Sequence, residues 1–157
     1  PSRERLPSPA MPRHWLPLLL FAAPLAPGCS SPTHTYDVSV RNDTARPLMV
    51  GLAKDGPPYE DLWASPEDLA IESPKPPERQ WGVPVPPGKT GSVNDVKGTL
   101  DRGTRAYVRV YQGAAELSEF LAIGRRSPNR IDLPLKPGGN AFVVTDTGGR
   151  LTAERQP

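Results

Sequence analysis

Residues 105–111 read Arg-Ala-Tyr-Val-Arg-Val-Tyr, and this stretch decides the fold class. Small apolar side chains alternate with charged or aromatic ones at a period of two, which is typical of a half-buried β-strand. We expect the core face of this strand to carry Ala106, Val108 and Val110. The opposite face is predicted to form a semi-exposed sheet surface that carries Arg105, Tyr107, Arg109 and Tyr111.

Further β-type runs, separated by turn residues, lie on both sides of this stretch. Residues 36–42 alternate in the same way, and together with residues 47–53 they are predicted to form an antiparallel hairpin. Pro84 indicates a short edge strand, because proline cannot donate a hydrogen bond to a β-ladder. The remaining predicted strands are residues 81–85, 90–96, 129–135, 140–146 and 150–154.

Residues 116–124 are compatible with two structures. A helix over residues 114–122 fits them, and so does a strand that ends before Gly124; we favour the strand. The chain then has seven to nine short strands at spacings of roughly 8–14 residues. This pattern predicts an all-β fold, an Ig-like antiparallel β-sandwich.

One short helix is predicted in a loop inserted between strands. Ser65 is a suitable N-cap, Pro66 suits the first helical position, and Glu67 and Asp68 favour the helix N-terminus. Three aromatic residues lie in or beside this insertion. One interpretation is that they bind a ligand by stacking on a sugar or a peptide. The other, which we favour, is that they plug the open end of the core. These residues are Tyr59, Trp63 and Trp81.

The span from Met11 to Cys29 has the order of an export signal. Arg13 supplies a positive charge, residues 15–26 are mostly apolar, and small residues lead to Cys29, the chain's single cysteine. An apolar run of about a dozen residues is typical of a signal peptide, whereas a membrane-spanning helix needs roughly 20. Residues 1–10 contain no methionine, and we expect them to be an over-extended gene start.

The segment Leu25-Ala26-Pro27-Gly28-Cys29 resembles the end of a bacterial lipoprotein signal. That family has Leu three residues before the cysteine, followed by small residues. Gly28 and Cys29 match this pattern, Leu25 is displaced by one position, and Pro27 is an uncommon residue there. The resemblance covers about 20 residues around the signal, and it carries no information about the rest of the chain.

This resemblance implies that residues 11–28 are a signal peptide and that the Cys29 thiol carries a diacylglycerol. Two or three acyl chains on one residue anchor a protein durably, whereas a single chain does so only marginally. The alternative is ordinary secretion with an unpaired cysteine left over. With lipidation, residues 29–35 form a tether and residues 36–157 a single β-sandwich domain.

The resemblance also implies a location. The protein is expected to be exported and anchored by lipid on the periplasmic or cell-surface side. Ser30 follows the cysteine, which in bacteria with two membranes indicates delivery to the outer membrane.

The charge balance argues against a nucleic-acid partner. Without residues 1–28 the chain has 129 residues, which is one domain's worth. Its basic side chains fall from 19 to 16 and its acidic ones from 17 to 16, so it is formally neutral. Nucleic-acid binding needs a basic face, and the densest basic pair is Arg125-Arg126.

Metal and cofactor binding are not expected from the residue types present. If Cys29 carries lipid, the remaining candidate ligands beyond it include a single histidine, His34, in the predicted tether. Zinc needs three or four Cys, His or acidic ligands, and a blue-copper site needs two His and a Cys. The six acidic residues between positions 55 and 72 lack the spacing of a calcium-binding loop.

Catalysis is not expected either. The predicted domain offers no histidine base and no Gly-x-Ser-x-Gly motif. The Gly88-Lys89-Thr90 segment follows two prolines, which lack the amides that bind phosphate. Glu116 and Glu119 cannot be placed on opposite sides of a cleft from the sequence.

The sequence therefore predicts a non-enzymatic, lipid-anchored module of the cell envelope, with a structural or binding role. One alternative is a carbohydrate- or peptide-binding module that uses the end carrying Tyr59, Trp63 and Trp81. The other is a subunit that joins a larger envelope assembly by a strand edge. The expected partners are the membrane, through lipid on Cys29, and an envelope protein or a glycan.

Overall fold

The computed structural model describes residues 31–56, 61–72, 81–101 and 103–157. Within these residues, eight strands form two four-stranded sheets with short helices at one side. The elements in chain order are β1 (Thr33–Asn42), β2 (Leu48–Lys54), a 3₁₀ turn (Asp61–Trp63), α1 (Pro66–Glu72), β3 (Val83–Val85), β4 (Thr90–Thr99), β5 (Ala106–Gln112), α2 (Leu117–Ala122), β6 (Arg130–Pro134), β7 (Gly138–Thr147) and β8 (Arg150–Gln156).

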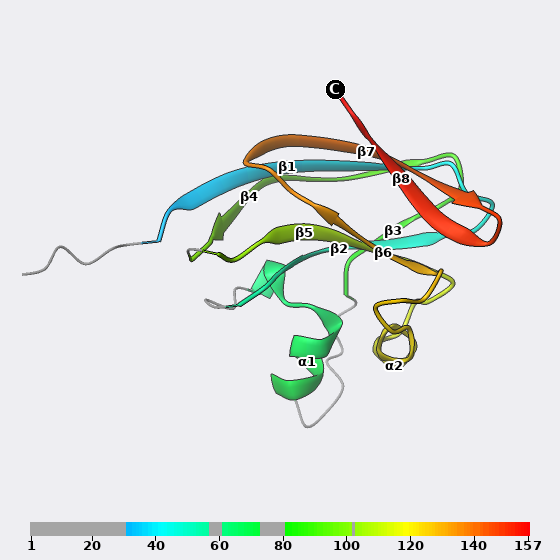
Figure 1. The fold of residues 1–157 in the computed structure, drawn as a ribbon, viewed down its shortest axis with the longest axis horizontal. Helices are drawn as coiled ribbons and strands as arrows, with labels where there is room; N and C mark the ends of the chain where they lie inside the picture. The colour runs from blue at the N-terminus through cyan, green and yellow to red at the C-terminus, as the bar shows by residue number, and fades with distance from the viewer. Residues whose placement is uncertain (1–30, 57–60, 73–80, 102) are drawn as a thin grey trace, which may run out of the picture.

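The two sheets pack face to face as a β-sandwich. One sheet has the order β4-β1-β7-β8 and the other β3-β2-β5-β6. In Figure 1 the first sheet lies above the second, and α1 and α2 lie below the second sheet, away from the first. Strand neighbours are antiparallel, except that β1 and β7 are parallel. The prediction of an all-β sandwich is confirmed, with this parallel pair as an exception to the expected antiparallel arrangement.

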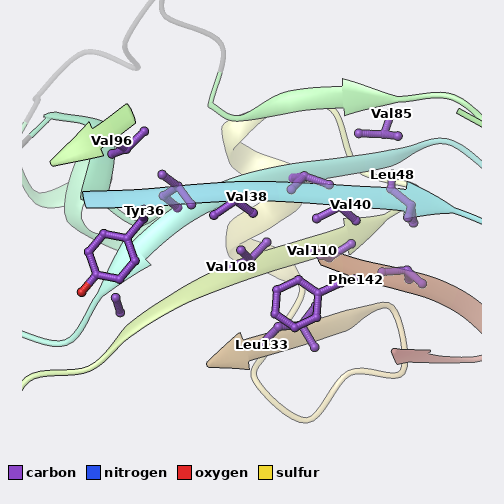
Figure 2. Packing of buried hydrophobic residues seen from close by; sticks show 14 of the residues in the cluster. Tyr36, Val38, Val40, Leu48, Val85, Val96, Val108, Val110, Leu133 and Phe142 are labelled. Atoms are coloured by element: carbon purple, nitrogen blue, oxygen red, sulfur yellow. The ribbon is translucent and has the colours of Figure 1, made fainter. Parts of the chain in front are cut away.

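The main core lies between the two sheets. Tyr36, Val38 and Val40 of β1 are all at most 2% exposed, and they face the interior together with Val108 and Val110 of β5. Figure 2 shows these side chains converging between the layers. The period-two alternation predicted for residues 36–42 and for the core face of residues 105–111 is therefore confirmed.

The predicted hairpin of residues 36–42 and 47–53 is wrong, because β1 and β2 belong to different sheets. The fully buried Asn42 side chain stabilises the connection between β1 and β2. Its amide nitrogen donates to the carbonyls of Arg46 and Val85, and its oxygen accepts from the amide and hydroxyl of Thr44. These bonds stabilise a compact turn that directs the chain from one sheet to the other.

Two other expectations need correction. Residues 116–124 contain α2 rather than the favoured strand, and the helical alternative is the right one. The Glu119 carboxylate accepts hydrogen bonds from the amides of Ala115 and Glu116, which satisfies donors that a helix start leaves free. β1 also begins at Thr33, so the last three residues of the predicted tether, with His34 among them, lie in a strand.

The predicted short helix and the predicted edge strand are confirmed. In α1, Asp68 accepts hydrogen bonds from the Ser65 amide and hydroxyl, at 2.8 and 2.6 Å, and the Asp68 amide donates to the Ser65 hydroxyl. This is a reciprocal cap of the helix start. Pro84 lies in β3, which forms one edge of its sheet.

Candidate functional site

The outer face of β5 is buried, not semi-exposed as expected. Tyr107, Arg109 and Tyr111 are 9%, 1% and 0% exposed. Phe120 of α2 packs on Tyr111 at a ring separation of 4.9 Å, and Glu67 of α1 contacts Arg109. Because α1 and α2 cover this face, its arginine and tyrosines become interior groups. Arg105, at the start of the face, remains exposed.

Two arginines lie together under α1. Arg109 of β5 and Arg130 of β6 each have side chains only 2% exposed. The Glu67 carboxylate bridges them, with Oε2 at 2.5 Å from Arg109 Nη1 and Oε1 at 2.9 Å from Arg130 Nη1. One carboxylate from the first turn of α1 therefore contacts both guanidinium groups.

Asp132 of β6 forms a second bridge between the same arginines. Its Oδ1 lies 3.0 Å from Arg109 Nε, and its Oδ2 lies 3.1 Å from Arg130 Nη2. Arg109 and Asp132 are direct partners in the β5–β6 register, so the sheet itself places this pair. Two positive and two negative groups thus form a neutral ion cluster, composed of Glu67, Arg109, Arg130 and Asp132.

Tyr107 and Asp55 extend the ion cluster toward the protein surface. The Tyr107 hydroxyl accepts a hydrogen bond from Arg109 Nη2 and donates one to Asp55, both at 3.1 Å. Asp55 also pairs with the exposed Arg105 at 3.1 Å. A continuous polar chain therefore runs from the buried arginines to solvent.

These contacts shift several pKa values. Burial opposes the charge on Glu67, but its own backbone amide, Arg109 and Arg130 outweigh this effect and lower the pKa of its carboxyl. Burial likewise opposes the charge on Arg109, and Asp132 and Glu67 more than compensate, so its pKa is raised. Burial raises the pKa of the Tyr107 hydroxyl to about 12. These shifts keep Glu67 and Arg109 charged, and Tyr107 neutral, at ordinary pH.

A polar cleft of about 320 Å³ opens beside the ion cluster. Lys54, Asp55, Asp68 and Arg125 line it together with cluster members. Three basic and three acidic side chains line this cleft, so it has no excess of one charge. Sequence reasoning missed the cluster because only the strand register places Arg109 opposite Asp132.

The aromatic residues singled out from the sequence are interior where they are described. Trp63 is 1% exposed, packs edge-on against Tyr36, and donates from Nε1 to the Lys97 carbonyl at 2.8 Å. Trp81 is 7% exposed and donates from Nε1 to the Ala64 carbonyl. The two indoles belong to separate hydrophobic clusters and present no shared stacking surface. Tyr59 lies outside the described residues.

A second cavity, predominantly apolar and about 470 Å³ in volume, lies where β1 and β5 begin. We call it the end groove. None of the ion-cluster residues lines it. Its lining includes Pro32, Tyr36, Leu100, Ala106, Pro134 and Leu135.

No group of three or more His, Cys, Asp or Glu residues suited to a metal ion occurs among the described residues. Within the same part of the chain, none of the helices has the length and apolar character needed to cross a membrane. Cys29 lies outside the described residues. Comparison with protein-family models, curated proteins and solved structures finds no match to this chain.

Proposed function

We propose that this protein is a lipid-anchored, non-catalytic module of the cell envelope, with a structural or binding role. The observation that carries the proposal is the lipoprotein-like segment Leu25–Cys29, which ends four residues before β1 begins at Thr33. A sandwich attached by so short a linker stays next to the membrane that holds its lipid, because each residue spans at most about 3.6 Å. On this proposal the protein works on the periplasmic or cell-surface side.

The chemistry of the ion cluster supports a non-catalytic role. A general base must be free to accept a proton near the working pH. The Glu67 carboxylate is engaged by two guanidinium groups, and its pKa is lowered rather than raised. Arg109 and Arg130 are likewise committed to the same two acids. The cluster is therefore proposed to attach α1 to the sheet.

For the fold, we propose that the sandwich is Ig-like in its proportions. The two-sheet arrangement and the loops at its ends agree with an Ig-like sandwich. The strand order differs from the constant-type Ig order, in which the first two strands share a sheet, because β1 and β2 lie in opposite sheets here.

The test of the proposal is the chemical state of residue 29. Cells that express the full chain are fed radiolabelled palmitate, and the mature product is analysed by mass spectrometry. We expect a mature N-terminus at Cys29 with diacylglycerol and label attached, and neither in the Cys29→Ser variant. A mature N-terminus elsewhere, or a bare thiol at position 29, would contradict the proposal.

A second candidate function, a subunit of a larger assembly, is supported by the strand edges. Three of the four edges carry features that disfavour pairing with another chain: Pro84 in β3, the register shift near Asp95 in β4, and Pro134 in β6. β8 has seven residues without a proline. Its Leu151 amide already donates to the Pro128 carbonyl, so the later part of the strand is the open part of this edge. Its edge is therefore the one of the four best suited to strand addition by a partner.

This second candidate is tested by mild crosslinking in intact membranes, followed by purification of the protein. A strand-docked subunit is expected to co-purify with an envelope protein, and Ala153→Pro is expected to abolish this because it changes the β8 edge. A monomer with no crosslinked partner would oppose it.

The glycan- or peptide-binding alternative has less support, since Trp63 and Trp81 are buried. A change of tryptophan fluorescence with a ligand from a broad panel would support it.

A further inference from the structure

The end groove lies at the point where the chain arrives from Cys29. β1 and β5 begin at this end of the sandwich, and β4 and β6 end there. Pro32 itself lines the groove, next to Leu100 and Leu135. The groove is therefore built from the first described residues of the chain and from the loops that surround them.

Two hydrogen bonds hold the arriving chain to the rim of the groove. The Ser31 hydroxyl donates to the Asp101 carboxylate, and the Leu100 amide donates to the Pro32 carbonyl at 3.3 Å. Residues 31 and 32 are thus fixed against the loop that follows β4. Two peptide units separate Ser31 from residue 29, and consecutive Cα atoms are 3.8 Å apart, so the linker from the fixed residues to the proposed lipid site is at most about 8 Å long.

The groove has the size and the surface expected for an apolar ligand. Its volume of about 470 Å³ falls within the usual range for small-molecule sites, about 300–1,000 Å³. Among its lining residues, Tyr36 and Ala106 are buried, and Leu100 and Leu135 are partly buried. Polar residues also line the groove, but its lining is predominantly apolar; these residues are His34, Asp101, Thr104 and Arg105.

We propose that the end groove holds an acyl chain carried on Cys29 of the same molecule. This inference rests on the proposed lipidation. Each methylene of an acyl chain removed from water is stabilising, in a bilayer or in a protein groove alike. The groove therefore shelters part of the lipid whenever no bilayer surrounds it, as during transfer through an aqueous compartment, and the short linker keeps the chain at its rim.

The experiment uses the full-length protein with a photoreactive lipid. Cells are fed palmitate that carries a diazirine, and the processed protein is purified, transferred to detergent-free buffer and irradiated. Mass spectrometry is then used to locate the crosslinks. Mixing isotopically light and heavy protein before irradiation separates crosslinks within one molecule from those between molecules. We expect intramolecular crosslinks from Cys29 lipid to groove-lining residues at positions 100, 101, 104–106, 134, 135 and 137.

Matched leucine variants test the role of the groove. Leu100→Gln places an amide in its wall, and a severalfold loss of these crosslinks is expected. Leu135→Gln is a second groove variant, and a thermal unfolding scan of each verifies that it folds. Leu62→Gln changes a leucine that is 57% exposed and does not line the groove, so its crosslinks should match those of the unchanged protein.

The outcomes separate this inference from the proposed function. If Cys29 carries the labelled lipid but crosslinks reach only other molecules or residues outside the groove, the acyl-chain inference is overturned and lipidation stands. Equal crosslinking in folded Leu100→Gln and Leu135→Gln would overturn it too. If no labelled lipid is attached to Cys29, the proposed lipidation itself fails, and the inference fails with it.

Discussion

Arg109 and Arg130 are buried like charges on neighbouring strands, and each depends on two carboxylates. Breaking a buried ion pair by removing one partner costs roughly 3–5 kcal/mol. The Glu67 side chain is 45% exposed, so solvent screens its contribution. We therefore expect Glu67→Ala to lower the free energy of unfolding by only about 1–2 kcal/mol. Urea titration measures this change. In the control variant Glu154→Ala, which removes an exposed glutamate outside the cluster, the free energy of unfolding should change by less than about 0.5 kcal/mol.

The lowered pKa of Glu67 makes this contribution depend on pH. Between its ordinary pKa of 4.5 and the lower folded value, the unfolded chain binds more protons than the folded one. The contribution is therefore complete above about pH 4.5, and it is lost as pH falls through the folded pKa. The stability difference between the parent protein and Glu67→Ala should shrink in acid. A constant difference down to pH 2 would show that Glu67 stabilises without its charge.

Tyr107 provides the complementary prediction in alkali. Burial raises its pKa from 10.0 to about 12, so the unfolded chain loses this proton before the folded one does. The contribution is complete below about pH 10 and is lost as pH rises to about 12, by roughly 2 kcal/mol. In Tyr107→Phe, the curve of unfolding free energy against pH should be flatter over this range. Because the pKa values of Tyr36 and Tyr111 are raised too, some slope will remain.

At the scale of elements, the indole of Trp81 packs directly on Gly51 of β2, and this contact attaches the segment before β3 to that strand. A Cβ on Gly51 of β2 would lie 2.4 Å from Cζ2 of Trp81. Trp81 is fixed by its hydrogen bond to Ala64 and by ring contacts with Tyr111 and Phe120, so it cannot move aside freely.

Gly51→Ala is therefore expected to destabilise the protein by about 1–3 kcal/mol, the usual cost of overpacking a core. Gly124→Ala is the control, since no atom lies within 4 Å of its added Cβ and its φ is not positive. Thermal unfolding of both variants provides the measurement. Equal melting temperatures would mean that the segment carrying Trp81 is loosely attached to β2.

The strands were largely predictable from the sequence, whereas their partners were not. Alternation marks residues 36–42 and 105–111 as strands, because each has one face in the core. Alternation cannot tell which strands pair, so the hairpin of β1 and β2 was a wrong prediction. The same limit applies to Arg109, because alternation alone predicts that it is a surface residue. Its burial depends on α1 and α2, which cover the outer face of β5.

At the scale of the whole molecule, the strand order joins the start of the sandwich to its end. β1 lies between β4 and β7, so it has both of its neighbours only after the last hairpin, formed by β7 and β8, is in place. Its pairing with β7 joins residues about 100 positions apart in the chain. Such non-local pairing is typical of slowly folding β proteins. It also leaves β8 as the last strand of its sheet.

Amide hydrogen exchange can show whether this edge is open. The Leu151 amide donates to the Pro128 carbonyl, away from β7, and alternate residues of a strand direct their amides the same way. The amides of Ala153 and Arg155 therefore point to the open side of β8. In the dilute free protein we expect slow exchange at Leu151 and fast exchange at Ala153 and Arg155, measured by NMR. A partner strand should slow exchange at these two amides selectively, because it supplies the carbonyls they lack. Slow exchange at both in a dilute monomer would mean that the edge is already covered, and strand docking at β8 would then have no available site.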